Sequence, residues 1–317
     1  MSTYHIMTIN MDGKSSACER RKQMVSNITS TRRPSVIFCQ ELPGEFKEQI
    51  VEECGGDGYS YKCAPESTGS GNHAAVMWKE NDFKGDEVKC TDSSIKEILE
   101  RLKEERPDVD ESWVPKRAAM VKLTSEKTRE SFLAVSWHGP QQINRKNTLK
   151  PKVHKRNVKK HKLKVLHFLI RFLLKVCEKV ELSSFIIGGD FNLNTTTFDL
   201  REYEGIWISR YELCTRDKEE RGQTFVKYKD TFIVMVKNAS DKPPLPVSSV
   251  EPLELKNSLL DHVPVVGDLK FLYKEVEKRS IKQDRGKLEQ RFQSYIFRKT
   301  FVYITVYQQS CDYAQII

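Results

Sequence analysis

The chain consists largely of short apolar segments of β-strand length, with patterns of helical spacing between them. Strand-like segments lie at residues 4–10, 35–40, 59–64, 73–78, 117–123, 131–137, 183–189, 231–236 and 262–269. Helical spacing occurs at residues 17–30, at residues 94–105 and in an apolar stripe of Leu166, Leu169, Ile170, Leu173, Leu174 and Cys177, whereas the proline-rich residues 242–252 predict a loop. Because the two kinds of segment are interspersed and strands are more numerous, we expect an α/β or α+β sandwich of packed sheets with helices outside.

Length and charge distribution limit the class of protein. The longest stretch of the 317 residues without Asp, Glu, Lys or Arg is residues 131–144, which has 14 residues and contains a proline and a histidine. That is shorter than the roughly 18 apolar residues that a membrane span needs, and the N-terminal residues lack the basic flank and apolar block of a signal peptide. We therefore expect an intracellular protein, cytoplasmic or nuclear, without a transmembrane segment, and we expect it to be a monomer.

The eight cysteines are scattered along the chain, and no pair has the CxxC spacing. This distribution predicts neither a zinc cluster nor a disulfide framework. Reduced thiols are the expectation for an intracellular protein.

The positive charge is concentrated in one run. Net charge is +9, and residues 145–164 contain 10 basic residues and no acidic one, so the rest of the chain is close to neutral. A local cationic strip favours polyanions such as nucleic acid or anionic lipid headgroups. The alternative is a solvated, disordered loop.

Polar residues of the types that bind metals or move protons follow several of the strand-like segments. They are Asn10 and Asp12 after the first segment, Glu41 after the second, His138 after residues 131–137, Asp190 and Asn192 after residues 183–189, and Asp261 and His262 at the last, while Asp230 directly precedes residues 231–236. Each alone has an ordinary explanation, since Asn and Asp are common in turns. Strand ends of a rigid sheet nevertheless aim such side chains into one cleft.

The order of these elements resembles the endonuclease/exonuclease/phosphatase superfamily, the DNase I-like metal-dependent phosphoesterases. The chain reads TINMDG at residues 8–13, VIFCQE at 36–41, AVSWH at 134–138, FIIGGDFN at 185–192, KDTFIVM at 229–235 and LLDHVP at 259–264. The resemblance covers about residues 4–270. It implies an α/β catalytic domain at residues 1–270, built as a four-layer sandwich of two packed mixed β-sheets flanked by helices, and leaves residues 271–317 as a C-terminal extension of unknown role.

The resemblance also implies a divalent metal, Mg²⁺ or alternatively Mn²⁺. A hard dication of this kind prefers oxygen ligands, keeps several waters and is bound through one or two carboxylates. Glu41 is the best candidate ligand, with Asn10, Asp12 and Asp261 near it in the family pattern.

The remaining motif residues take proton-transfer and phosphate-binding roles in the family pattern. His262, oriented by Asp230, is the expected base for an attacking water, and Asp190 holds or deprotonates the same water. Asn192 donates to the phosphoryl oxygens. His138 contacts the phosphate or protonates the leaving group.

One element departs from the family pattern. In secreted nucleases of this superfamily, a Glu on the preceding strand pairs with the histidine that corresponds to His138. Here that stretch, residues 69–78, offers Asn72 and His73 but no carboxylate. We therefore expect His138 to act as a neutral hydrogen-bond donor, with a catalytically inactive protein as the alternative.

The cationic run favours a nuclease that hydrolyses phosphodiester bonds of nucleic acid. Its expected contacts with the phosphate backbone are Lys155, Arg156, Lys159 and Lys160, which supply affinity without sequence readout. A phosphatase or phosphodiesterase acting on phosphoinositides or other lipid headgroups is the enzymatic alternative. A non-catalytic module that binds nucleic acid or protein is the alternative from another class.

Overall fold

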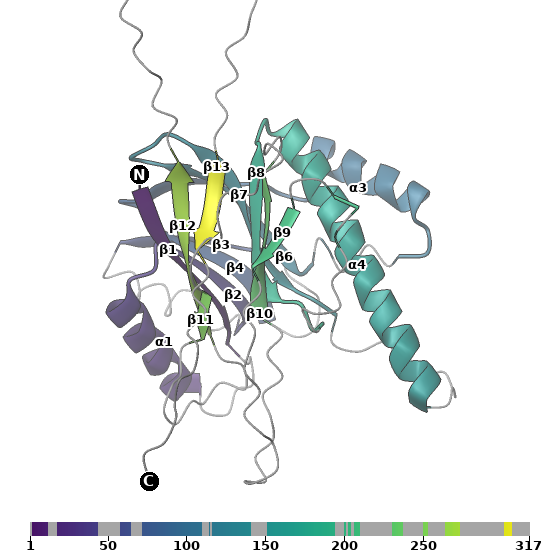
Figure 1. Ribbon diagram of the computed structural model, residues 1–317, viewed down its shortest axis with the longest axis horizontal. Helices are drawn as coiled ribbons and strands as arrows, with labels where there is room; N and C mark the ends of the chain where they lie inside the picture. Colours follow the sequence, from purple (N-terminus) through teal and green to yellow (C-terminus); the bar gives the residue numbers. More distant parts are fainter. Residues whose placement is uncertain are drawn as a thin grey trace, which may run out of the picture.

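The computed structural model describes residues 2–11, 18–43, 58–64, 72–109, 114, 116–140, 151–193, 200, 202–203, 206–209, 230–236, 250–252, 264–272 and 301–305. In these segments two mixed β-sheets pack face to face, and helices lie on both outer sides (Figure 1). The predicted α/β sandwich of packed sheets is confirmed.

The first sheet has the strand order β11-β12-β1-β2-β4-β3, with β13 paired to β12. Its strands are β1 (Ser2–Asn10), β2 (Val36–Pro43), β3 (Tyr59–Cys63), β4 (Asn72–Lys79), β11 (Val250–Pro252), β12 (Val265–Leu272) and β13 (Phe301–Thr305). The pair β1 and β2 is parallel, whereas β12 runs antiparallel to β1 and β4 antiparallel to β2.

The second sheet has the order β5-β6-β7-β8-β10-β9. Its strands are β5 (Phe83–Glu87), β6 (Ala118–Ser125), β7 (Ser131–His138), β8 (Ser184–Asp190), β9 (Ile206–Ser209) and β10 (Asp230–Val236). The pair β7 and β8 is parallel, and α4 (Pro151–Lys179) connects these two strands.

Three apolar clusters hold the four layers together. The cluster between the sheets includes Phe38, Phe132 and Phe232. On the outer face of the second sheet, α3 (Ser93–Glu105) and α4 bury the predicted stripe of α4 against β7 and β8. On the outer face of the first sheet, α1 (Cys18–Arg32) packs through Val25 and Ile28. Strands buried on both faces read as continuous apolar runs, which explains the composition of β7 and β8.

Two glycines allow close packing around the end of β8, one between the sheets and one against the neighbouring strand β7. A Cβ at Gly188 would lie 2.5 Å from Cγ of Phe38 across the sandwich, and a Cβ at Gly189 would lie 2.1 Å from the carbonyl oxygen of Trp137. Real side chains do not tolerate such distances, so the Gly-Gly pair is required by packing. It also brings the residue that follows, Asp190, close to both sheets.

The structure differs from the sequence-based expectation at several elements. The helix expected after the basic run begins at Pro151, inside that run, and continues to Lys179. The disordered-loop alternative is therefore wrong for residues 151–164. The proline-rich segment expected to be a loop contains the short strand β11 at its end. Strands β5 and β9 were not expected, and Phe301–Thr305 of the C-terminal extension pairs with β12.

Candidate active site

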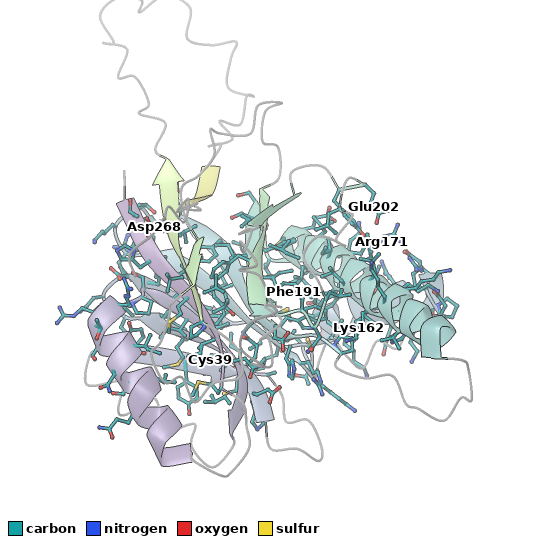
Figure 2. The ribbon with its side chains drawn as sticks, turned by 60° about the horizontal axis from the view of Figure 1, so that its bottom comes forward. Cys39, Lys162, Arg171, Phe191, Glu202 and Asp268 are labelled. Atoms are coloured by element: carbon teal, nitrogen blue, oxygen red, sulfur yellow. The ribbon has the colours of Figure 1, made fainter. Side chains whose placement is uncertain are left out.

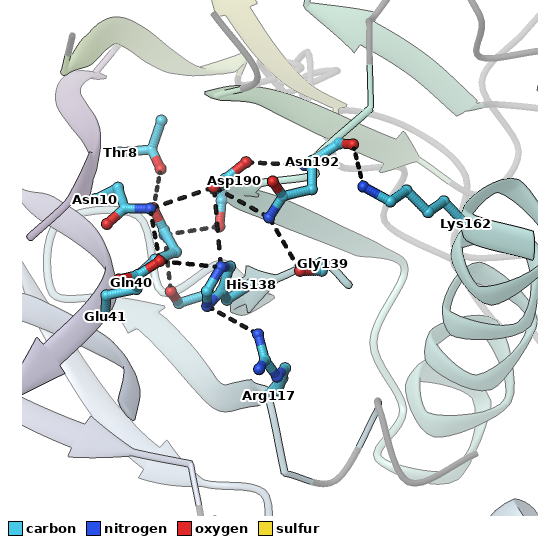
Figure 3. A network of polar contacts seen from close by, with 12 residues as sticks. Thr8, Asn10, Gln40, Glu41, Arg117, His138, Gly139, Lys162, Asp190 and Asn192 are labelled. Carbon is cyan, nitrogen blue, oxygen red and sulfur yellow. Dashed lines mark hydrogen bonds and ion pairs between the residues drawn. The ribbon is translucent and has the colours of Figure 1, made fainter. Parts of the chain in front are cut away.

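The carboxyl ends of four strands meet at one end of the sandwich. In the parallel pair β1 and β2, Asn10 lies opposite Gln40, and in the parallel pair β7 and β8, His138 lies opposite Asp190. Parallel strands end at the same edge of a sheet, and the packing of the two sheets brings the two edges together. Five of the residues expected at separate strand ends therefore form one network (Figure 3): Asn10, Glu41, His138, Asp190 and Asn192.

Asp190 is the central acceptor of this network. Its carboxylate is fully buried. One carboxylate oxygen accepts from the backbone N–H of Asn192 at 2.8 Å, and the other accepts from Nδ2 of Asn10 and Nδ2 of Asn192, each at 3.2 Å. Three N–H groups donate to this one carboxylate. Asp190 is thus held rigidly as a hydrogen-bond acceptor.

Glu41 stands at an irregularity of β2, where the pairing with β4 shifts register between Cys39 and Leu42. Its φ of 53° is in the left-handed region, which costs an L-residue about 1–2 kcal/mol. At this irregularity the Glu41 carboxylate lies close to the second sheet, with Oε1 3.3 Å from Nε2 of His138. The same oxygen lies 3.5 Å from Nδ2 of Asn10, at the end of β1. Local backbone strain of this kind is concentrated at functional sites.

Gln40 ties the two sheets together beneath the site. Its buried amide nitrogen donates to Oγ of Ser136 at 3.0 Å and to the carbonyl oxygen of Gly188 at 3.4 Å, both on the second sheet. Its amide oxygen accepts from the hydroxyl of Thr8 at 3.2 Å. Gln40 therefore fixes the position of the adjacent Glu41 relative to β7 and β8.

Arg117 contacts His138 and was not predicted from the sequence. Nη1 of Arg117 lies 3.1 Å from Nδ1 of His138. A guanidinium has no acceptor, so Nδ1 must accept this hydrogen bond. A neutral ring then carries its hydrogen on Nε2, which faces Oε1 of Glu41 at 3.3 Å and Oδ2 of Asp190 at 3.9 Å. The expected neutral hydrogen-bond donor thus has a structural cause.

The charge of Arg117 is balanced by the carboxylates of the site. Burial lowers the pKa of the Arg117 guanidinium, and the negative charges of Glu41 and Asp190 act in the opposite direction. The sequence signal was weak: a basic residue directly before β6. Because Ala118 of β6 pairs with Trp137 of β7, Arg117 is placed beside His138.

The turn after β8 is held from several sides. Asn192 has a φ of 50°, and its Nδ2 donates to the carbonyl oxygen of Gly139 at 3.1 Å. The Phe191 ring packs edge-on against Trp137 with centroids 5.4 Å apart. Nζ of Lys162, from α4, donates to the carbonyl oxygen of Asn192 at 3.0 Å. Lys162 belongs to the cationic run, but no sequence signal distinguished it from its neighbours.

The remaining expected site residues are only partly placed. The backbone of Asp230, at the start of β10, lies opposite Asp190. Asp12, Asp261 and His262 lie outside the described residues.

The side-chain oxygens of the site fit a hard dication that is held mainly by one carboxylate. Within the described part of the chain, no group of three or more His, Cys, Asp and Glu side chains is arranged to hold a metal ion. Mg²⁺ does not need such a cage, because it retains several waters and uses one or two protein carboxylates. The partly buried Glu41 and the neighbouring Asn10 amide supply ligands of that chemistry.

The cationic run lies on the first half of α4, and Lys162 of this run contacts the turn that carries Asn192. The expected nucleic-acid contacts Lys155, Arg156, Lys159 and Lys160 all lie on this helix, and Lys159 and Lys160 are exposed. In the described helices there is no segment long and apolar enough to cross a membrane.

Comparison with known proteins identifies the fold. No protein-family model matches the sequence, and no curated protein matches it. Solved structures do match: an endonuclease/exonuclease/phosphatase from Bacteroides vulgatus has a TM-score of 0.55 at 16% identity, covering 85% of this chain and 99% of that chain. The human Nocturnin catalytic domain with a bound sulfate anion has a TM-score of 0.55 at 14% identity, covering 84% and 92%. A Bacteroides thetaiotaomicron mannosyl-6-phosphatase has a TM-score of 0.54 at 14% identity, covering 83% and 98%.

The chain therefore has the DNase I-like fold of endonuclease/exonuclease/phosphatase proteins, as the order of its strand-end motifs predicted.

The contact between Arg117 and His138 makes a spectroscopic prediction. In the unmodified protein, the ¹⁵N chemical shifts of the His138 ring should identify Nε2 as the nitrogen that carries hydrogen. Arg117→Met removes the donor that keeps hydrogen off Nδ1, so the ring should populate both tautomers. Lys116→Met, a change at the exposed neighbouring residue, is the matched control and should leave the wild-type pattern. Hydrogen on Nδ1 in the wild type would contradict the geometry.

Proposed function

We propose that the protein is a metal-dependent phosphoesterase. The observation that carries the proposal is the network at one end of a DNase I-like sandwich in which Glu41, His138 and Asp190 meet. The two carboxylates have distinct environments: Glu41 is partly exposed, and Asp190 is buried and held by N–H donors. A site that separates a metal-binding carboxylate from a water-orienting one suits hydrolysis.

The roles follow from what each group can donate or accept. A bound Mg²⁺ or Mn²⁺ supplies a Lewis acid that polarises a phosphoryl oxygen and stabilises charge on the leaving oxygen. Glu41 is the carboxylate that holds it. Asp190 accepts a hydrogen from the attacking water and orients it, and Nε2 of His138 donates to a phosphoryl oxygen. Asn192 was expected to donate there as well, but both hydrogens of its Nδ2 are bonded to Gly139 and Asp190, so we assign it to holding the Asp190 carboxylate.

His262 and Asp230 complete the proposed site as base and orienting carboxylate. The start of β10 beside Asp190 supports this assignment for Asp230. Each single substitution should cost nearly as much as the double one, because a base without its orienting group loses both position and tautomer.

Nucleic acid is the proposed substrate, and the support comes from the geometry of α4. Lys155, Lys159 and Lys162 have the spacing i, i+4 and i+7, so these positions follow one another along one face of the helix. The last of them, Lys162, is buried and donates to the turn that carries Asn192, so it marks where the row meets the site and is not itself a phosphate contact. A row of cations that leads to a phosphoesterase site is suited to a polymer with a phosphate at every unit, rather than to a single small headgroup.

The proposal is tested by hydrolysis assays on plasmid DNA, single-stranded oligonucleotides, RNA and a soluble phosphoinositide, each with Mg²⁺ and with EDTA. Cleavage of nucleic acid that EDTA abolishes is the expected result. Cleavage of the phosphoinositide alone would assign a lipid-headgroup phosphatase. Binding without hydrolysis of any substrate, unchanged in Glu41→Ala, would assign a non-catalytic module.

The cationic run on α4 also predicts how DNA binding depends on salt concentration. Replacing Lys155, Arg156, Lys159 and Lys160 with Gln should flatten the slope of log K against log salt for duplex DNA by up to about four units, because each lost phosphate contact removes about one unit of counterion release. The measurement is a fluorescence-anisotropy titration at several salt concentrations in EDTA.

The control carries the same change in net charge elsewhere on the surface. Lys96, Lys103, Lys127 and Lys175 are exposed, and their replacement with Gln should leave the slope within about one unit of the wild type. Equal slopes in the two quadruple variants would remove residues 155–160 of α4 from the nucleic-acid interface.

A further inference from the structure

Lys162 is a buried lysine at the boundary between the cationic run and the active site. Its residue is 8% exposed, whereas Lys159 and Lys160 on the preceding turn are exposed. In Figure 2 it lies on α4 next to Phe191, the middle residue of the turn after β8. Burial of an ammonium group costs free energy unless hydrogen bonds compensate it. The partner of its ammonium group therefore matters for this position.

The bond from Lys162 reaches the backbone of the turn. Nζ donates to the carbonyl oxygen of Asn192 at 3.0 Å (Figure 3). Asn192 has left-handed backbone geometry, which sets the direction of this carbonyl group. The same residue donates through its backbone N–H to Oδ1 of Asp190 and through Nδ2 to Oδ2 of Asp190. A displacement of Asn192 would therefore displace the Asp190 carboxylate as well.

The turn has a second attachment, which is independent of α4. The backbone N–H of Gly139 donates to the carbonyl oxygen of Asp190 at 2.7 Å, and Nδ2 of Asn192 donates to the carbonyl oxygen of Gly139. These bonds join the ends of β7 and β8 to each other. Lys162 joins them to the helix, whose apolar side chains farther along pack on the sheet.

We propose that Lys162 is a positioning residue: its ammonium group holds the Asp190–Asn192 turn from the side of α4 and thereby keeps both side chains in place for the reaction. The proposal rests on the proposed function in assigning the reacting groups to this turn. In this proposal the role of Lys162 differs from that of Lys159 and Lys160, which the proposed function assigns to binding substrate phosphates. A misplacement of about 1 Å at reacting groups can cost about 10²-fold in rate.

The first test measures the turn itself and needs no substrate. In Lys162→Met, the amide hydrogen of Asn192 should exchange with solvent at least about 10-fold faster than in the wild type, because the turn opens more often. Lys162→Arg, which retains a cationic donor, should restore most of the protection. Lys175→Met is the matched control, since Lys175 lies on the same helix and its ammonium group pairs with Glu178 at the surface.

The second test compares turnover with binding. Lys162→Met should lower kcat for oligonucleotide hydrolysis at least about 10-fold and leave the oligonucleotide Kd in EDTA within about twofold. Lys175→Met, at the surface of the same helix, should leave both kcat and Kd close to the wild type. Partial recovery of kcat in Lys162→Arg is expected.

The outcomes separate the alternatives. Unchanged exchange at Asn192 overturns the positioning role, and so does faster exchange throughout β7 and β8, which would indicate a general loss of stability. A weaker Kd with unchanged kcat would make Lys162 another phosphate contact. If the wild type hydrolyses no phosphoester, the proposed function fails, and the exchange measurement still decides whether Lys162 holds the turn.

Discussion

Glu41→Gln is expected to lower phosphoester hydrolysis by at least about 10²-fold, equivalent to about 3 kcal/mol or more of activation free energy, and to leave the fold intact. The substitution removes the charge of the carboxylate that the site offers to a dication and keeps the size of the side chain. The amide can still accept from Nε2 of His138, so the network keeps one of its bonds. Initial rates over a titration of Mg²⁺ measure the effect.

Two readouts accompany the rate. Binding of Mn²⁺, followed by its effect on water proton relaxation, should weaken in Glu41→Gln together with the rate. Glu100→Gln is the control, because Glu100 pairs with Lys96 on the exposed face of α3. A variant at Glu41 that reached the wild-type rate at any Mg²⁺ concentration up to wild-type saturation would show that this carboxylate does not hold the metal.

Asp190→Asn is expected to have a still larger effect, at least about 10³-fold on kcat. The variant loses a negative charge and also gains an NH₂ group. In the place of Oδ1, the NH₂ group would face the backbone N–H of Asn192. In the place of Oδ2, it would face the side-chain amides of Asn10 and Asn192, so in either case one hydrogen-bond donor faces another. A buried polar group without its partner costs about 1–3 kcal/mol, so the free energy of unfolding should fall by a similar amount.

Single-turnover kinetics and urea unfolding measure these two effects separately. Asp268→Asn provides the matched control, since Asp268 lies on β12 and pairs with the exposed His5. It should leave both kcat and the free energy of unfolding close to wild type. Loss of activity at Asp190 without loss of stability would show that the donors rearrange around the amide, and full activity would remove Asp190 from the reaction.

The two predictions distinguish the chemistry of the site from the choice of substrate. Both depend on the meeting of β1, β2, β7 and β8 at one edge and apply to any phosphoester. The choice of nucleic acid depends on α4, and the salt-slope experiment addresses it alone. A phosphoinositide enzyme would thus show both losses at Glu41 and Asp190 with an unchanged DNA salt slope.

Most strands and several site residues could be predicted from local sequence. Apolar runs such as those of β7 and β8 are recognisable because a strand buried on both faces needs apolar residues at most of its positions. Asn10, Glu41, His138 and Asp190 could be predicted because each directly follows or ends such a run. Their spacing along the chain reflects topology, which explains why their order alone indicated the fold.

The sequence alone could not define the extent of α4. The run of Lys and Arg after His138 is compatible with a solvated loop, but Lys and Arg are also good helix formers. The apolar stripe farther along anchors the helix to the second sheet, and the helix extends from there back to Pro151. Proline fits the first turn of a helix, where its missing N–H is not needed.

What the sequence by itself determined is therefore most of the strands, their order along the chain and the residues that end them; β5, β9 and β11 were not predicted. Only the tertiary structure decided which side chains orient these residues. Arg117 reaches His138 because of the register between β6 and β7, and Lys162 reaches Asn192 because α4 packs beside the end of β8. The physical reason is that a strand end is a local property of the chain, whereas a hydrogen bond between two side chains depends on how separate elements are placed in space.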